Sequence, residues 1–226
     1  MSTYDLEEQE QLEQLKAFWQ RYGGLISGVV LVAALAVAGY QGWNKYQYQQ
    51  ASSAAGLFDE AARFTREKNV DGALQAYRTL KEKHPSTAFA QQAALAVAET
   101  AQQAGKSDEA VEALRWASTQ PIAEYAALAK LRLAGLLMER RDLKGAMAAL
   151  DGEWPAAYLP LVEDRRGDIL AQTGDIAKAQ EAYRKAYTTM DSEEKYRNMI
   201  RVKLGATGVD VSTLPDSAAS AASGAQ

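Results

Sequence analysis

Cysteine is absent from the 226 residues, and histidine occurs once, at position 84. Without cysteine the chain can form neither a disulfide nor a thiolate metal site, and a single histidine cannot complete an imidazole cluster. His84 stands directly before Pro85, where helix capping or exposure to solvent explains it more simply than chemistry. A glycine-rich phosphate loop after a strand is also lacking. We therefore expect no catalytic residues, no metal and no cofactor.

The sequence also lacks an excess of basic residues. Its 25 Lys and Arg are outnumbered by 29 Asp and Glu, which gives a net charge of -4. Proteins that bind nucleic acids usually mass their basic side chains on one surface, whereas here both signs are interspersed along the chain. This composition argues against nucleic acid as a partner.

Charged residues are missing altogether from residues 22–44, between Arg21 and Lys45. As a helix this stretch would be about 35 Å long, enough to cross a hydrocarbon core of about 30 Å. Aromatic residues, which favour the two headgroup layers, flank it on both sides. They are Phe18, Trp19, Tyr22, Tyr40, Trp43, Tyr46 and Tyr48. The sequence therefore predicts a transmembrane helix over residues 22–44.

A cleaved signal peptide is the alternative, since Ala36, Val37 and Ala38 satisfy the small-x-small rule for cleavage after Ala38. Residues 1–21 form an acidic segment, however, whereas signal peptides begin with basic residues. We expect an uncleaved signal anchor. Lys16 and Arg21 before the span, against Lys45 after it, favour a cytoplasmic N-terminus.

The segments beside and within the span allow further expectations. Residues 45–55 contain no proline or glycine and are rich in Gln and Ala, which predicts a helical stalk. Residues 5–20 fit either an amphipathic lead-in to the anchor or a solvated polar tail. Gly24 and Gly28 could let a second helix approach, or could be chance glycines in a small-residue segment.

From residue 56 onward the pattern is that of helical hairpins, and the motif A-x-x-A-[YL] occurs four times. Its first alanines lie at positions 73, 110, 146 and 179, so successive copies are 37, 36 and 33 residues apart. Twelve residues before each copy lies another small residue. These are Ala61, Ala98, Ala134 and Gly167. Two antiparallel helices that cross closely need small side chains at both contact points, so each copy indicates one hairpin.

This pattern resembles the tetratricopeptide repeat, a unit of about 34 residues with two helices. The fold class that follows is all-α, a single N-terminal transmembrane helix followed by a tetratricopeptide-like solenoid over residues 56–204. The usual first-helix Trp is missing, only Pro85 occupies the usual place of the closing proline, and residues 151–160 are inserted before the fourth unit. A generic helical bundle is the alternative. Residues 205–226 show no apolar face, and we expect them to be disordered.

A narrower resemblance appears when the anchor and the repeats are taken together. The acidic start, the motif Gly42-Trp43-Asn44, the stalk sequence over residues 50–55, Trp154 and the charged run over residues 163–168 follow one another in order. Over residues 4–204 the chain resembles the YfgM-type ancillary subunits of the bacterial SecYEG translocon. No single one of these motifs is specific, and their order along the chain carries the resemblance.

The resemblance implies an inner-membrane protein with a cytoplasmic N-terminus and a periplasmic repeat domain. Its implied partners are the SecYEG translocon, the membrane-anchored periplasmic chaperone PpiD, other periplasmic chaperones and nascent exported chains. The implied function is to link emerging chains to those chaperones, and also to act as a negative regulator of an envelope stress response. The alternatives are a membrane-anchored scaffold that docks one folded partner independently of the translocon, and a regulator with the reverse topology.

Solenoids of this type bind peptides or proteins in a groove lined by the first helix of each unit. Aligned on the small residues, the units lack the Lys and Asn that grip a terminal carboxylate in related chaperone-binding domains. The candidate protein-binding groove instead carries an apolar strip with acidic residues at its border. The strip consists of Phe58, Leu95, Leu128, Leu131 and Met138, and the border of Glu99, Asp164 and Asp168. Ordinary core between the repeats is the other interpretation of the apolar positions.

Overall fold

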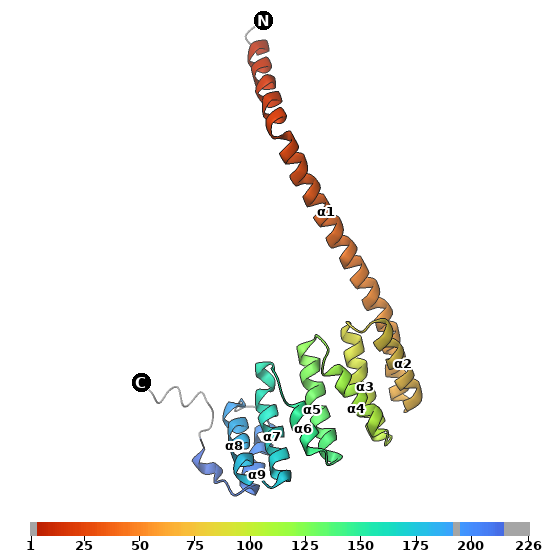
Figure 1. The fold of residues 1–226 in the computed structure, drawn as a ribbon, viewed down its shortest axis with the longest axis vertical. Coiled ribbons are helices and arrows are strands. Elements are labelled where there is room, and N and C mark those ends of the chain that lie inside the picture. The colour runs from red at the N-terminus through yellow and green to blue at the C-terminus, as the bar shows by residue number, and fades with distance from the viewer. Residues whose placement is uncertain (1–3, 192–194, 215–226) are drawn as a thin grey trace. The chain divides into compact units, whose positions relative to one another are not determined.

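The computed structural model describes residues 4–191 and 195–214. Within these ranges the chain forms α-helices and two short 3-10 helices, and no strand. It divides into two compact units, Met1–Ser52 and Ser53–Gln226. The first helix, α1 (Tyr4–Arg66), provides the secondary structure of the first unit and the opening helix of the second (Figure 1). The predicted all-α class is thus confirmed for the described residues.

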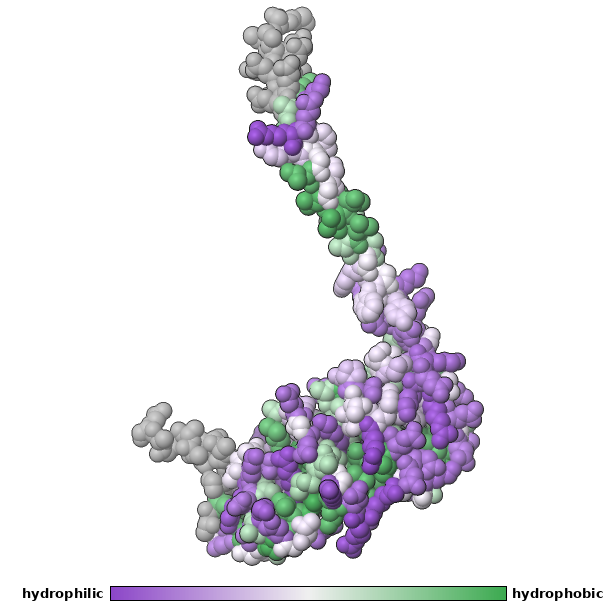
Figure 2. Space-filling model, viewed as in Figure 1, coloured by the Kyte–Doolittle hydropathy of each residue, from purple (hydrophilic) through white to green (hydrophobic). Residues whose placement is uncertain are grey.

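The first unit is a helix with an exposed apolar band. Four consecutive residues, Val29, Val30, Leu31 and Val32, are each at least 60% exposed. Since consecutive residues point to different sides of a helix, the apolar band is exposed all the way around. Figure 2 shows this band as the most hydrophobic part of the unit. It falls within the predicted span, residues 22–44.

No single described helix meets the combined length and hydropathy of a membrane span. One bent pair does, formed by Lys16–Leu25 and Ser27–Arg66 with 42° between them. The bend lies within the predicted span, near its start. Gly23, Gly24, Ser27 and Gly28 surround the bend, and helices kink most readily at Gly and Ser.

The second unit is built from four helical hairpins that follow one another in chain order (Figure 1). The end of α1 pairs with α2, α3 with α4, α5 with α6, and α7 with α8. Their bounds are α2 (Val70–Lys83), α3 (Ala88–Gln103), α4 (Ser107–Ala117), α5 (Ala123–Glu139), α6 (Leu143–Ala149), α7 (Leu159–Thr173) and α8 (Ile176–Thr189). Ala54 is already fully buried, so the unit begins slightly before the predicted residue 56.

The turns inside the four hairpins share one backbone geometry. Each contains a residue with positive φ: Lys68 (56°), Gly105 (78°), Arg141 (62°) and Gly174 (84°). The residue after it donates its backbone N–H to the carbonyl five positions earlier, at 2.8 to 3.0 Å. This closes the preceding helix as a Schellman motif. The next helix then starts at once, which keeps the two helices antiparallel and close.

The predicted small residues lie at the helix crossings. Ala73, Ala110, Ala146 and Ala179 are fully buried, and their partners Ala61, Ala98 and Ala134 are at most 4% exposed. At Gly167 a β-carbon would lie 2.5 Å from two ring carbons of Tyr183. Only glycine allows α7 and α8 to approach this closely, so the prediction of small residues at both contact points is confirmed.

The predicted insertion separates the third and fourth hairpins. After α6 the chain turns through Gly152 and forms the 3-10 helix η1 (Ala156–Tyr158), which leads directly into α7. The indole Nε1 of Trp154 donates to the carbonyl of Leu150 at 3.1 Å. Lys130 Nζ lies 5.1 Å from the Trp154 ring centroid. The tryptophan thus fastens the insertion to α5 and α6.

The C-terminal boundary differs from the expected one. Helix α9 (Arg197–Ala206) and the 3-10 helix η2 (Val211–Thr213) follow α8, so the described chain remains ordered beyond Gly205. Ile200 and Leu204 are fully buried, and Val209 is 6% exposed. These apolar residues cover the end of the solenoid, which would otherwise leave the last hairpin uncapped. Residues 215–226, the rest of the predicted disordered tail, lie outside the described residues.

The core consists of two hydrophobic clusters. The larger extends from Ala54 to Ile169 and joins the first three hairpins to α7. The smaller contains Ala179, Tyr183, Ala186, Tyr187, Met190, Ile200, Leu204 and Val209. Leu161 of α7 packs against both clusters. Helix α7 therefore lies between the two clusters and contacts both.

Candidate protein-binding groove

An open groove of about 880 Å³ lies along the first helices of the second, third and fourth hairpins. Helices α3, α5 and α7 form its walls, and α4 and α8 each contribute one residue, Leu114 and Tyr183. A second hollow of about 440 Å³ between the end of α1 and α3 shares Glu99 with it. The first helix of every hairpin thus faces a hollow, which is the arrangement solenoids use to bind polypeptides.

Polar pairs cross the groove between α3 and α5. Arg132 Nη1 lies 3.6 Å from a carboxylate oxygen of Glu99 and donates to the Leu95 carbonyl at 3.3 Å. One turn along, Gln102 Nε2 donates to Glu139 at 2.8 Å. These pairs fix the side chains on both walls. Because Arg132 and Glu99 are 41% and 60% exposed, their mutual attraction is screened by water and contributes little to stability.

The wall contributed by α7 carries Arg165 and Asp168. Arg165 Nη1 lies 3.7 Å from Asp168 Oδ2, beyond hydrogen-bonding distance, and its Nε is buried without a hydrogen-bond partner. The guanidinium rests beside Gly135 of α5, where a β-carbon would lie 3.7 Å from Nη1. Asp168 makes shorter contacts with two other side chains than with Arg165. Tyr183 Oη lies 2.9 Å from its carboxylate and Lys203 Nζ lies 2.7 Å from it.

The structure brings only part of the predicted apolar strip to this groove. Leu131 and Met138 line it, although they are only 8% and 7% exposed. Leu95 belongs to the larger core cluster, and Phe58 and Leu128 pack against that cluster from its edge. The Phe58 ring meets Phe89 with 5.6 Å between centroids. The five residues therefore do not form one continuous strip in the groove.

Only part of the predicted acidic border lies in the groove. Glu99 and Asp168 line the groove, whereas Asp164 is 1% exposed and lies beneath α9. Its carboxylate accepts from Lys203 Nζ at 2.8 and 2.9 Å and from Tyr196 Oη at 2.7 Å. Asp164 is therefore a structural anchor for the last helix. Sequence reasoning missed Lys203 and Tyr196 because both lie on or beside a helix it did not expect.

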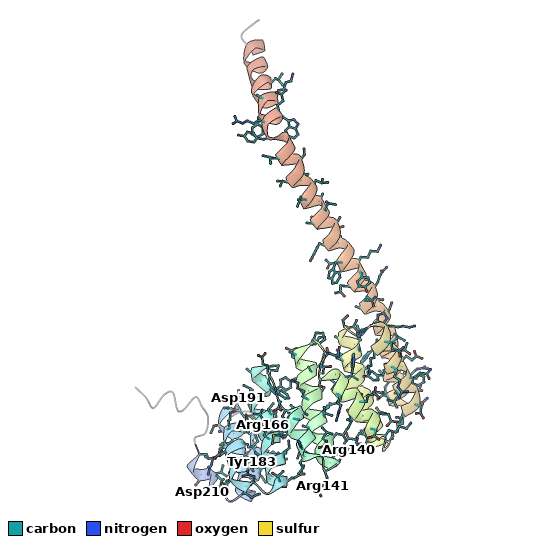
Figure 3. All side chains as sticks on the ribbon, viewed as in Figure 1. Arg140, Arg141, Arg166, Tyr183, Asp191 and Asp210 are labelled. Atoms are coloured by element: carbon teal, nitrogen blue, oxygen red, sulfur yellow. The ribbon has the colours of Figure 1, made fainter. Side chains whose placement is uncertain are left out.

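The remaining members of the charged run over residues 163–168 also have structural partners. Glu163 accepts from Arg166 at 2.9 Å and from Lys185 at 2.8 Å. Arg166 also donates to the Leu150 carbonyl at 3.2 Å, which ties α7 to the end of α6. Figure 3 marks Arg166 and Tyr183 in this part of the fold, with Arg140 and Arg141 at the turn between α5 and α6. In the described ranges, no three His, Cys, Asp or Glu residues gather as metal ligands would.

Comparison with known proteins adds independent information. The family described as "Tetratricopeptide repeat-like domain" matches residues 16–209. A protein of Neisseria gonorrhoeae is 30% identical over 88% of this chain and 96% of its own length. Proteins of Escherichia coli and Aggregatibacter actinomycetemcomitans are 26% and 24% identical, each over 98% of its own length. All three relatives bear the name "Ancillary SecYEG translocon subunit".

Proposed function

Because this chain belongs to the family of ancillary SecYEG translocon subunits with a tetratricopeptide repeat-like domain, we propose that it is a non-catalytic accessory subunit of the SecYEG translocon. The observation that carries the proposal is the extent of the match. The family match extends over residues 16–209, which include the N-terminal apolar segment as well as the repeats. The similarity to the relative from N. gonorrhoeae leaves only 4% of that relative uncovered.

The proposed anchor is the apolar segment over residues 22–44, which holds the protein in the bacterial inner membrane. Its band of Val and Leu is exposed, and transfer of such apolar surface from water into lipid is favourable. Paired aromatic rings support the two interfaces. Phe18 and Tyr22 lie 5.1 Å apart between centroids before the band, and Trp43 and Tyr46 lie 6.1 Å apart after it. The N-terminal segment, residues 1–21, is then cytoplasmic and the repeat domain periplasmic, joined through the stalk at residues 45–55.

The proposed work of the repeat domain is to link chains that emerge from the translocon to periplasmic chaperones, PpiD among them. An open groove walled by α3, α5 and α7 supports this role, since it offers a long concave surface with apolar and polar contacts. Leu131 and Met138 form its apolar floor, and Met adapts to varied partners.

Copurification tests the central claim. The full chain, tagged at its C-terminus and extracted from its own membranes with a mild detergent, is expected to bring SecY, SecE and SecG with it. Val30→Asp combined with Val32→Asp should abolish this, because charges at the centre of a span oppose insertion. Lys144→Asp, on the exposed face of α6, is the matched control. Recovery of the unmodified chain without the translocon would favour the alternative, a scaffold that docks one folded partner.

Topology is tested with single cysteines, since the chain has none of its own. Lys144→Cys places a thiol on an exposed position of the repeat domain, and Ser2→Cys places one before the anchor. A membrane-impermeant maleimide added to spheroplasts should label the first and spare the second. Labelling of Ser2→Cys alone would establish the reverse topology, that of a cytoplasmic regulator.

A further inference from the structure

The carboxylates of the groove are already engaged by donors within the protein. Glu99 faces Arg132 at 3.6 Å, and Glu139 accepts from Gln102 at 2.8 Å. Asp168 holds both Tyr183 Oη and Lys203 Nζ, at 2.9 and 2.7 Å. A ligand that entered the groove with a positive charge would have to compete with these partners. The acidic side chains are therefore poorly placed to recruit a basic ligand.

Arg132 pairs with Glu99, but the other two arginines of the groove lining, Arg165 and Arg141, are not engaged to the same degree. Arg165 has one long ion pair, at 3.7 Å, to a carboxylate that Lys203 and Tyr183 already occupy. Its Nε is buried and donates to no acceptor. Arg141, also in the groove lining, makes no ion pair or side-chain hydrogen bond to any described residue. Among the charged side chains of the groove, the unused hydrogen-bonding capacity thus consists of guanidinium donors.

A guanidinium presents its donors as a planar fork that fits a carboxylate with two parallel hydrogen bonds. The Arg165 guanidinium lies against Gly135 of α5, and the side chain of Arg165 is 33% exposed, so part of the fork faces the groove. The walls also carry the amides of Gln102 and Gln172, which can bond the main chain of an extended segment. Leu131 and Met138 at the floor suit an adjacent apolar side chain.

We infer that the groove selects an extended segment of a partner polypeptide that carries an Asp or Glu side chain next to apolar residues. Arg165 binds the carboxylate, and Arg141 supplies a second positive charge. Free inorganic anions and lipid headgroups lack the main chain that the glutamine amides would bond. This inference deepens the proposed function, on which it rests, by naming the class of segment that the repeat domain would hold.

The test uses the full-length chain in detergent micelles and two fluorescein-labelled peptides. Their sequences are Gly-Ala-Leu-Asp-Ala-Leu-Gly and the same peptide with Asn in place of Asp, both with blocked ends. Fluorescence anisotropy should show that the Asp peptide binds about tenfold more tightly, the effect of one charge-assisted hydrogen-bonded pair. The difference should shrink as salt is added, because screening weakens the ion pair. Equal affinity for the two peptides, or binding of neither, would overturn the inference.

Variants assign the effect to particular side chains. Arg165→Gln should remove the preference for the Asp peptide, and Arg141→Gln should reduce it. Arg140→Gln is the matched control, because Arg140 is adjacent in sequence but pairs with Asp108 at 2.7 Å and does not line the groove. If Arg165→Gln does not fold, Arg165→Lys, which keeps the charge and loses the fork, should retain only part of the preference. An unchanged preference in a folded Arg165 variant would refute the assignment.

The two proposals can fail separately. A chain that copurifies with SecYEG but does not distinguish the peptides keeps the proposed function and loses the inference. A chain that selects the Asp peptide but is recovered without SecYEG keeps a peptide-binding groove in a protein with another role.

Discussion

Lys203 of α9 donates to Asp164 of α7, with its Nζ 2.9 and 2.8 Å from the two carboxylate oxygens. Asp164 is 1% exposed, and the side chain of Lys203 is 23% exposed. The same ammonium lies 2.7 Å from Asp168, so one cation serves two carboxylates of α7. This contact fastens α9 over the end of the solenoid.

Removal of that cation should destabilise the repeat domain strongly. Lys203→Met leaves the buried Asp164 carboxylate with only Tyr196 Oη as a donor, and we expect a loss of about 3 to 5 kcal/mol in the free energy of unfolding. Urea unfolding followed by circular dichroism measures it. The control is Lys178→Met, which breaks a solvent-exposed pair with Asp175 and should leave stability nearly unchanged. Equal losses in the two variants would contradict the structural role of Lys203.

The crossing of α7 and α8 should not tolerate a methyl group at position 167. In Gly167→Ala the new β-carbon would lie 2.5 Å from the Tyr183 ring, so the helices must separate, at a cost of about 1 to 3 kcal/mol. Gly135→Ala is the matched control, since its β-carbon would meet Arg165 at an ordinary 3.7 Å. There the better helix propensity of alanine should raise stability by up to about 1 kcal/mol. Thermal unfolding distinguishes the two, and a stable Gly167→Ala protein would mean that the crossing is misplaced.

The left-handed turn residues should respond in opposite directions to substitution. Lys68 has φ of 56°, a conformation that is unfavourable for a residue with a β-carbon, so Lys68→Gly should stabilise the domain by about 0.5 to 1 kcal/mol. At the equivalent position of the fourth hairpin, Gly174→Ala should destabilise it by about 1 kcal/mol. Denaturant midpoints compare the two. A loss of stability in Lys68→Gly would show that the lysine side chain contributes more than its backbone costs.

Stability should fall at alkaline pH. Burial raises the pKa of Tyr183, and the nearby Asp168 carboxylate raises it further. Burial and the hydrogen bond to Asp164 raise the pKa of Tyr196 in the same direction. Because the folded protein keeps both phenols protonated, their contribution is complete below the unfolded pKa of about 10 and is lost as the pH rises above it.

Unfolding free energies measured on both sides of that pH test this sign. Tyr183→Phe should be less stable near neutrality, since it loses the bond to Asp168, but its stability should fall less steeply in alkali. The same alkaline slope with and without the Tyr183 hydroxyl would assign the effect to other groups.

The hairpins could be predicted from the sequence because their contacts are local. Each A-x-x-A motif and its small partner twelve residues earlier lie on adjacent helices joined by one short turn. Two of the four turns also have a glycine, Gly105 or Gly174, at the position where the backbone is left-handed, a conformation that favours glycine. Lys68 and Arg141 adopt the same conformation, and neither residue type indicates it. Those two turns could be located only by their spacing in the repeat.

The groove was predicted less well because its chemistry depends on distant residues. Asp164 is buried and Asp168 is occupied because of Lys203, which lies 39 positions after Asp164. Lys203 belongs to α9, a helix outside the pattern of the four hairpins. Without Lys203, both aspartates would be expected to border an open surface. Arg165 was overlooked for the same reason, since its spare donors follow from Asp168 being engaged elsewhere.

The division of the hydrophobic core bears on how the protein acquires its fold during synthesis. Chains leave the ribosome amino end first, and segments fold as they become available. The larger cluster ends at Ile169, so the first three hairpins and α7 can close while α8 and α9 are still being made. The smaller cluster must wait for Ile200, Leu204 and Val209. Helix α8 can pair with α7 as soon as it is made, but the smaller cluster is complete only when the last residues of the domain pack against α8.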